Sequence, residues 1–149
     1  MSTSELSFRQ SDRLVFLGIF LVTLGLVVGL IIPFFANPRM GLSSHLEGIM
    51  NGIFLVILGL IWPRVKLSKK WMTLTFWLAV YGSFANWFGV LLAAIFNAGG
   101  QLTVAAQGKK GSDLAELSVN FFLVTLTLAM LLVCTVLLVG LWHGRHRSF

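Results

Sequence analysis

Polar chemistry concentrates at one place in this apolar chain, in the run His45-Leu-Glu-Gly-Ile-Met-Asn51. The run places an imidazole, a carboxylate and a carboxamide within about one and a half helical turns. An imidazole ligates metals or transfers protons, and a carboxamide both donates and accepts hydrogen bonds. Ionisable groups inside a membrane segment cost roughly 2.5 kcal/mol or more at its centre, so they mark functional sites. We therefore place the candidate site here.

The elements that must position this run are membrane helices. Hydrophobic residues make up 57% of the 149 residues and charged residues only 11%, which excludes a soluble domain. Four stretches reach the roughly 17 to 20 residues that a spanning helix needs. They are residues 14–35, 44–62, 71–96 and 117–142. None alternates like a barrel strand, so we predict an all-α, integral membrane four-helix bundle, a single domain over residues 1–149.

Basic residues are distributed unevenly between the two ends of these spans. One side carries eight: Arg9, Arg13, Arg64, Lys66, Lys69, Lys70, Arg145 and Arg147. The other side carries three: Arg39, Lys109 and Lys110. The positive-inside rule then predicts a multi-pass protein of the cell inner membrane with both termini cytoplasmic. The net charge of +6 reflects this topology, so we expect no nucleic-acid partner.

Other polar residues within the spans are few, and three of them join the candidate site. At 1.5 Å per residue, Asn51 and Asn86 lie roughly 10 and 15 Å below the outer interface, so we expect them to face one cavity. Tyr81 is the chain's only tyrosine and lies on the same predicted helix as Asn86. The long connection over residues 97–116 suits either a lid over this site or a plain solvated loop.

Helical periodicity divides the opening run between two directions. Glu47 and Asn51 are four residues apart and share a face, whereas His45 points about 120 degrees away from Asn51. The different direction of His45 is compatible with a metal ligand and equally with an ordinary histidine at the membrane interface. For Glu47 the residue pattern favours a place in the first helical turn, with Ser44 near the cap, where the helix dipole stabilises a carboxylate.

The segment Asn37-Pro-Arg-Met-Gly-Leu-Ser-Ser-His-Leu-Glu-Gly-Ile-Met-Asn-Gly52, set among four spans, resembles the hydroxylaminobenzene mutases. The run Tyr81-Gly-Ser-Phe-Ala-Asn-Trp87 is similar to their third-helix motif. A more distant resemblance is to styrene oxide isomerase, which shares the four-helix layout and a histidine followed six residues later by an asparagine.

The resemblance implies a redox-neutral isomerase that takes part in the degradation of aromatic compounds. Mutases of this family move a hydroxyl group from nitrogen to the ortho ring carbon, which gives 2-aminophenol. Styrene oxide isomerase uses ferric haem b at the interfaces of a homotrimer, and the matching residue here is His45, as axial ligand of the haem iron. The iron acts as a Lewis acid on the substrate oxygen. Asn51 is then the substrate-facing donor, and Tyr81 or Asn86 positions the aryl group or transfers a proton.

Other functions remain as alternatives. One is isomerisation of an aryl epoxide to an aldehyde, and another is a non-catalytic membrane scaffold. A haem electron-transfer subunit needs a second axial ligand, yet His143 and His146 lie across the membrane from His45. A proton-coupled drug exporter needs a carboxylate in its first span, and residues 14–35 contain none. The single Cys134 excludes an internal disulfide.

Overall fold

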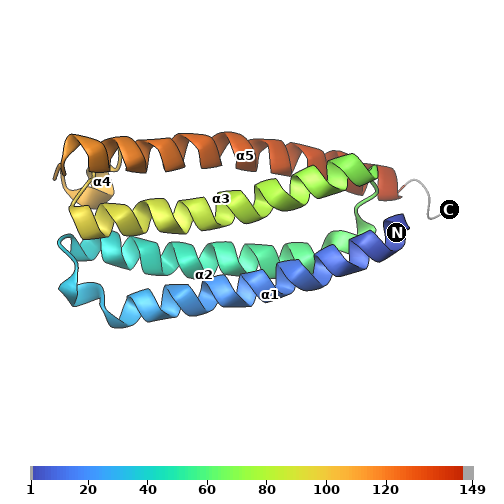
Figure 1. The fold of residues 1–149 in the computed structure, drawn as a ribbon, viewed down its shortest axis with the longest axis horizontal. Coiled ribbons are helices and arrows are strands. Elements are labelled where there is room, and N and C mark those ends of the chain that lie inside the picture. Colours follow the sequence, from blue (N-terminus) through green and yellow to red (C-terminus); the bar gives the residue numbers. More distant parts are fainter. Residues whose placement is uncertain (1, 146–149) are drawn as a thin grey trace.

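The four apolar runs fold as four long antiparallel helices, with two short connections and a longer one between α3 and α5 (Figure 1). The structure is a computed structural model, and it describes residues 2–145. Its helices are α1 (Thr3–Leu30), the 3-10 turn η1 (Ile32–Phe34), α2 (Pro38–Ile61), the 3-10 turn η2 (Trp62–Arg64), α3 (Lys69–Phe96), the short α4 (Thr103–Ala106) and α5 (Asp113–Arg145). Within the described range the chain forms no strand.

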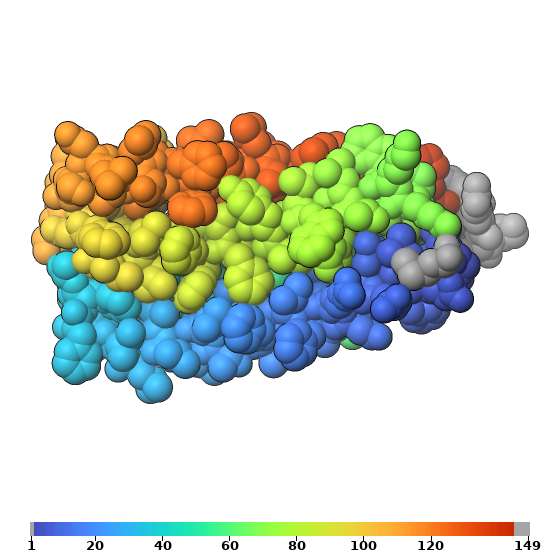
Figure 2. All heavy atoms as spheres, in the orientation of Figure 1, coloured from blue at the N-terminus to red at the C-terminus, as the bar shows by residue number. Residues whose placement is uncertain are grey.

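The long helices pack mainly in chain order. α1 packs against α2, α2 against α3 and α3 against α5, while α1 touches α3 over a smaller area. Figure 2 shows one face of the bundle, on which the yellow and green surface of α3 lies between blue α1 and orange to red α5. Large apolar side chains of α5, such as Leu117 and Leu128, face outward. Most of α5 is therefore free to contact lipid or another chain.

Within the described residues, α1, α2 with η2, α3 and α5 are long and apolar enough to cross a membrane. This confirms the predicted all-α, multi-pass membrane fold. The start of α1 and the end of α5 lie at the same end of the bundle, as four crossings require (Figure 1). The cytoplasmic placement of that end stays a prediction.

The helix that carries the candidate site begins earlier than its predicted span. The Asn37 side chain caps α2 by accepting a hydrogen bond from the backbone N–H of Met40 at 3.3 Å. Pro38 occupies the first helical position, where a residue without an N–H costs nothing. Because α2 starts six residues before Ser44, the candidate residues lie deep in a formed helix.

The long connection between α3 and α5 is anchored to the bundle. The two carboxylate oxygens of Glu116 accept hydrogen bonds from the backbone N–H groups of Gly100 and Gly111, each at 2.9 Å. The Asn37 side chain also donates to Oδ1 of Asn97, which ends α3 in the left-handed conformation. These contacts fix the connection beside the start of α2.

Glycines bring α1 and α2 into backbone contact. A Cβ added at Gly48 would lie 2.6 Å from the Cα of Gly25, closer than any side chain tolerates. Such close approach between small residues is the usual basis of helix packing in membranes. The close contact brings the His45 turn of α2 against α1.

Candidate active site

His45 lies half-buried against α1, and its environment selects one tautomer. Its Nδ1 lies 2.8 Å from the backbone oxygen of Gly25. A carbonyl oxygen only accepts hydrogen bonds, so Nδ1 carries the proton and Nε2 keeps its lone pair. The ring lies over Gly29, where an added Cβ would come within 2.6 Å of Nδ1. α1 thus orients the imidazole and selects the Nδ1–H tautomer of its neutral form.

Glu47 differs from its prediction as a helix-start residue. α2 begins at Pro38 and has no acidic residue in its first turn, so the placement of Glu47 and Ser44 at the helix start is wrong. Glu47 lies in the third turn. Ser44 is fully buried, and its hydroxyl donates to the backbone oxygen of Trp87 at 3.4 Å. The early cap at Asn37, which satisfies the first turn, is the reason for the difference.

The carboxylate of Glu47 joins α2 to α3. Its Oε2 accepts hydrogen bonds from Nδ2 of Asn51 at 2.9 Å and from Nδ2 of Asn86 at 2.6 Å. We call Glu47, Asn51 and Asn86 the acid–amide cluster. The structure thus brings Asn51 and Asn86 together, as their depths predicted, around the carboxylate of Glu47, which the residue pattern assigned to the helix start. The four-residue spacing of Glu47 and Asn51, which puts both side chains on one helix face, could have indicated that Glu47 belongs to the site.

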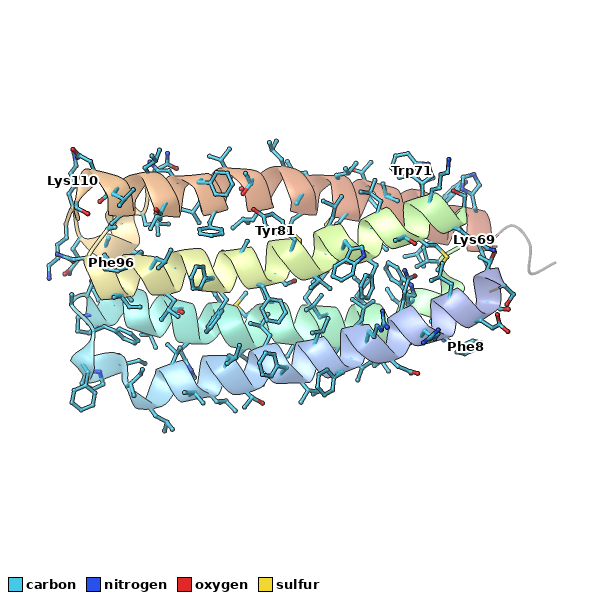
Figure 3. The ribbon with its side chains drawn as sticks, in the orientation of Figure 1. Phe8, Lys69, Trp71, Tyr81, Phe96 and Lys110 are labelled. Atoms are coloured by element: carbon cyan, nitrogen blue, oxygen red, sulfur yellow. The ribbon has the colours of Figure 1, made fainter. Side chains whose placement is uncertain are left out.

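Tyr81 lies elsewhere, on the side of α3 that faces α5 (Figure 3). Its hydroxyl is 2.6 Å from Oγ1 of Thr125, which itself donates to the backbone oxygen of Phe121. Tyr81 therefore donates to Thr125. It lines a shallow groove of about 280 Å³ with residues that include Phe84, Trp87, Phe88 and Phe122. Within one chain, Tyr81 does not contact the acid–amide cluster.

His45 and the acid–amide cluster occupy opposite flanks of α2. His45 bonds to α1 and Glu47 bonds to α3. Between the two flanks runs an exposed apolar stripe of α2, made of Leu42, Leu46, Met50, Ile53 and Ile57. Two residues along a helix correspond to about 200 degrees of rotation, so a single copy cannot turn both groups toward the same ligand.

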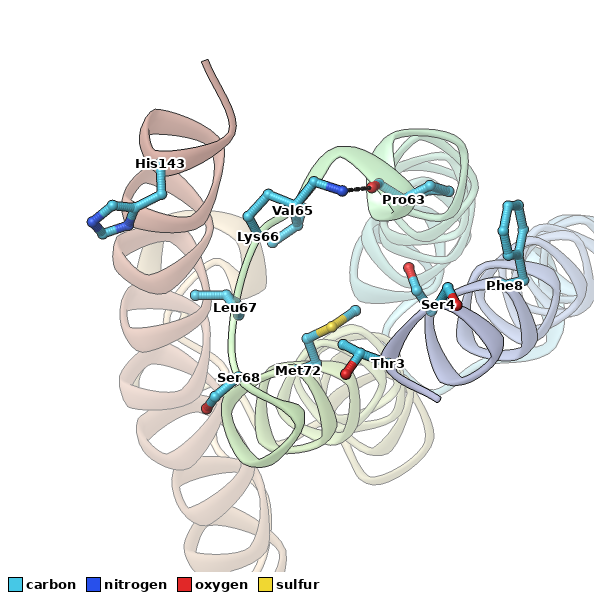
Figure 4. A pocket seen from close by; sticks show the side chains of 11 residues that line it. Thr3, Ser4, Phe8, Pro63, Val65, Lys66, Leu67, Ser68, Met72 and His143 are labelled. Carbon is cyan, nitrogen blue, oxygen red and sulfur yellow. Dashed lines mark hydrogen bonds between the residues drawn. The ribbon is translucent and has the colours of Figure 1, made fainter. Parts of the chain in front are cut away.

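A cavity of about 670 Å³ lies at the other end of the bundle, where α1 begins and α5 ends (Figure 4). His143 and Lys66 line it, and Nζ of Lys66 donates to the backbone oxygen of Pro63 at 3.3 Å. His143 is thus far from His45, as the topology predicted, and His146 lies outside the described residues. Among residues 2–145, no three His, Cys, Asp or Glu side chains group to hold a metal ion.

The fold is that of a multi-pass membrane protein, and the chain belongs to the styrene oxide isomerase family, whose model matches residues 10–142. Among curated relatives, hydroxylaminobenzene mutase HabB of Ectopseudomonas oleovorans is 48% identical over 130 residues, 87% of this chain and 79% of the relative. Hydroxylaminobenzene mutase HabA of the same organism is 46% identical over 125 residues, 83% of this chain and 93% of the relative. No solved structure matches the chain.

These comparisons confirm the resemblance and identify the chain as an isomerase of the mutase type. A non-catalytic scaffold is thereby excluded. The roles of His45, Asn51, Tyr81 and Asn86 stay predictions.

Proposed function

We propose that this chain rearranges N-hydroxy arylamines, such as hydroxylaminobenzene, to 2-aminophenols within the cell inner membrane. The observation that carries the proposal is its 46–48% identity to two hydroxylaminobenzene mutases over more than four fifths of the chain. Substrate and product are isomers, so no oxidant or reductant is needed. The N–O bond breaks, a C–O bond forms at the ortho carbon, that carbon loses its proton, and the nitrogen gains one.

We further propose that His45 holds a ferric haem b. Metal-ligating histidines usually donate their second ring N–H to a carbonyl or carboxylate, as Nδ1 of His45 does to Gly25. Nε2 is left as the atom that would ligate the iron, and a single such side chain can hold a haem. When bound, the haem supplies a Lewis acid that withdraws electron density from the substrate oxygen.

The chain's own residues then bind and orient the substrate. The side-chain oxygens of Asn51 and Asn86 are held in place by Glu47, so they offer fixed hydrogen-bond acceptors to the N–H and O–H groups of an aryl hydroxylamine. The neighbouring apolar side chains, Met50 and Ile53, limit the access of water to the reacting group. Tyr81 is a candidate for positioning an aryl ring in its aromatic groove.

A homotrimer fits the division of α2 into two flanks. In a ring of copies, each interface joins one surface of a copy to a different surface of the next. An interface that joins the two flanks of α2 would bring His45 of one copy toward the acid–amide cluster of its neighbour. The exposed apolar stripe between the flanks, with Met50 64% exposed, is suited to that contact. This arrangement supports a site shared between two copies.

The second candidate function is isomerisation of an aryl epoxide to an aldehyde. The observation that favours it is the match to the styrene oxide isomerase family model over residues 10–142. Both reactions begin with the breaking of a bond to oxygen that a Lewis acid promotes.

One purification tests the proposal. We expect detergent-solubilised protein to show a Soret absorption band that His45→Ala abolishes, together with the activity. Hydroxylaminobenzene and styrene oxide are assayed side by side, and we expect the first to be converted faster. A colourless but active wild type would contradict the role of haem, and faster conversion of styrene oxide would favour the second function.

A further inference from the structure

The acid–amide cluster has an unequal supply of donors and acceptors. The Nδ2 of Asn51 donates to Oε2 of Glu47 and also to its backbone oxygen, each at 2.9 Å. Because an amide nitrogen carries two hydrogens, both donors of Asn51 are used. In this arrangement Asn51 presents its Oδ1, an acceptor, to a ligand, whereas the resemblance implies a donor role, which stays a prediction.

Asn86 is held in the same orientation. Its Nδ2 donates to Oε2 of Glu47 at 2.6 Å, so its Oδ1 also turns away from the carboxylate. Three oxygens of the cluster accept no hydrogen bond from the described residues: Oδ1 of Asn51, Oδ1 of Asn86 and Oε1 of Glu47. The second N–H of Asn86 is the one donor of the cluster that is not used. The cluster thus offers three acceptor oxygens against a single donor.

We propose that the acid–amide cluster selects substrates that donate hydrogen bonds, and that Glu47 is the residue that sets this specificity. The inference rests on the proposed function. An aryl hydroxylamine brings an N–H and an O–H, and its aminophenol product brings more. An aryl epoxide has one acceptor oxygen and no donor, so it would leave the oxygens of the cluster unpaired in an apolar setting.

Unpaired acceptors in an apolar setting discriminate strongly between ligands that donate hydrogen bonds and ligands that do not. Sites built to hydrogen-bond a substrate reject the analogue that lacks the group far more strongly than apolar pockets reject a change in size. Asn51, Asn86 and Glu47 are all half-buried, with the exposed apolar residues Leu46 and Met50 beside them on α2. Glu47 therefore separates substrates with donors from epoxides without touching the bond that breaks.

The variant Glu47→Gln tests this role. The new amide nitrogen requires an acceptor, so one asparagine oxygen turns inward and is lost to the substrate. Two ligands that are not turned over report the preference: aniline, with two N–H groups, and N,N-dimethylaniline, with none. Calorimetric titration gives the Kd of each. The ratio of the two values cancels any contact that both ligands share.

We expect the wild type to bind aniline about tenfold or more tightly than N,N-dimethylaniline, and Glu47→Gln to reduce this ratio to about twofold or less. Asn86→Ala is expected to reduce it in the same direction. The matched control is Glu5→Gln, because Glu5 is an exposed residue at the start of α1. It is expected to keep the wild-type ratio.

A wild type without preference, or a folded Glu47→Gln protein with the wild-type ratio, would overturn the inference. The wild-type measurement decides even where a variant fails to fold. Turnover of hydroxylaminobenzene is measured separately and reports on the proposed function. If the wild type does not convert hydroxylaminobenzene but still prefers aniline, the proposed mutase function would be contradicted. The inferred preference of the acid–amide cluster for hydrogen-bond donors would still hold.

Discussion

At the residue scale, two glycines of α1 orient His45, one through its backbone carbonyl and the other through its lack of a side chain. The carbonyl of Gly25 fixes its tautomer, and the missing side chain of Gly29 leaves room for the ring. Both glycines lie on α1, four residues apart, so they present one face to α2. A single methyl group at Gly29 would enter the space that the imidazole occupies.

The variant Gly29→Ala is therefore expected to displace His45. Its Cβ would lie 2.6 Å from Nδ1, so the ring must move and lose its bond to Gly25. If His45 holds the haem, the haem content per chain should fall severalfold, as is typical when the partner of a metal ligand is lost. The Soret absorbance of purified protein measures this. The control is the same change in a His45→Ala background, where it should have no effect on absorbance. An unchanged haem content in Gly29→Ala alone would contradict the orientation of His45 by Gly25 and Gly29.

The sequence predicts some features of the acid–amide cluster and not others. The four-residue spacing of Glu47 and Asn51 places them on one face, and the depths of Asn51 and Asn86 were enough to predict that they meet. That Glu47 joins them depends on where α2 begins, and Asn37 and Pro38 set that start six residues earlier than hydropathy does. The position of Tyr81 toward α5 depends on how α3 and α5 pack, which no local pattern contains.

At the scale of elements, the close contact between α1 and α2 lets Nδ1 of His45 reach the backbone oxygen of Gly25. The backbones approach at Gly25 and Gly48, and the stripe of small residues was visible in the sequence. The four helices were predictable because a membrane allows few structures, and hydropathy identifies them directly. The exact ends of the helices were not predictable from hydropathy, because capping residues and prolines determine where a helix starts and stops.

Replacing Gly48 by alanine tests this contact. The added Cβ would lie 2.6 Å from the Cα of Gly25, so the helices must separate. Overpacking of this kind typically costs 1 to 3 kcal/mol, roughly, in the free energy of unfolding. Unfolding in mixed detergent micelles, followed by circular dichroism, measures the change. Leu128→Ala on the exposed face of α5 is the control and should change stability by less than about 0.5 kcal/mol; equal effects would argue against a tight α1–α2 contact.

At the scale of the whole molecule, one copy carries the parts of the site on opposite flanks of α2. His45 faces α1, Asn51 and Asn86 meet on the α3 side, and the exposed apolar stripe lies between them. A protein that acts as a single copy gains nothing from this division. In the proposed homotrimer, each interface would complete one site, and each copy would contribute its two halves to different neighbours.

Mixing two inactive variants tests the shared site. His45→Ala and Asn51→Ala chains, carrying different tags, are expressed together, and the mixed assemblies are purified through both tags. An interface is intact when its histidine comes from the Asn51→Ala chain and its asparagine from the His45→Ala chain. Each mixed trimer contains one such interface among its three, so the purified mixed assemblies regain about a third of the sites. We expect hydroxylaminobenzene turnover near that fraction of the wild-type rate, while each variant alone stays inactive. If both halves of the site came from the same chain, every site would carry one of the two substitutions, and the mixture would be no more active than its parents.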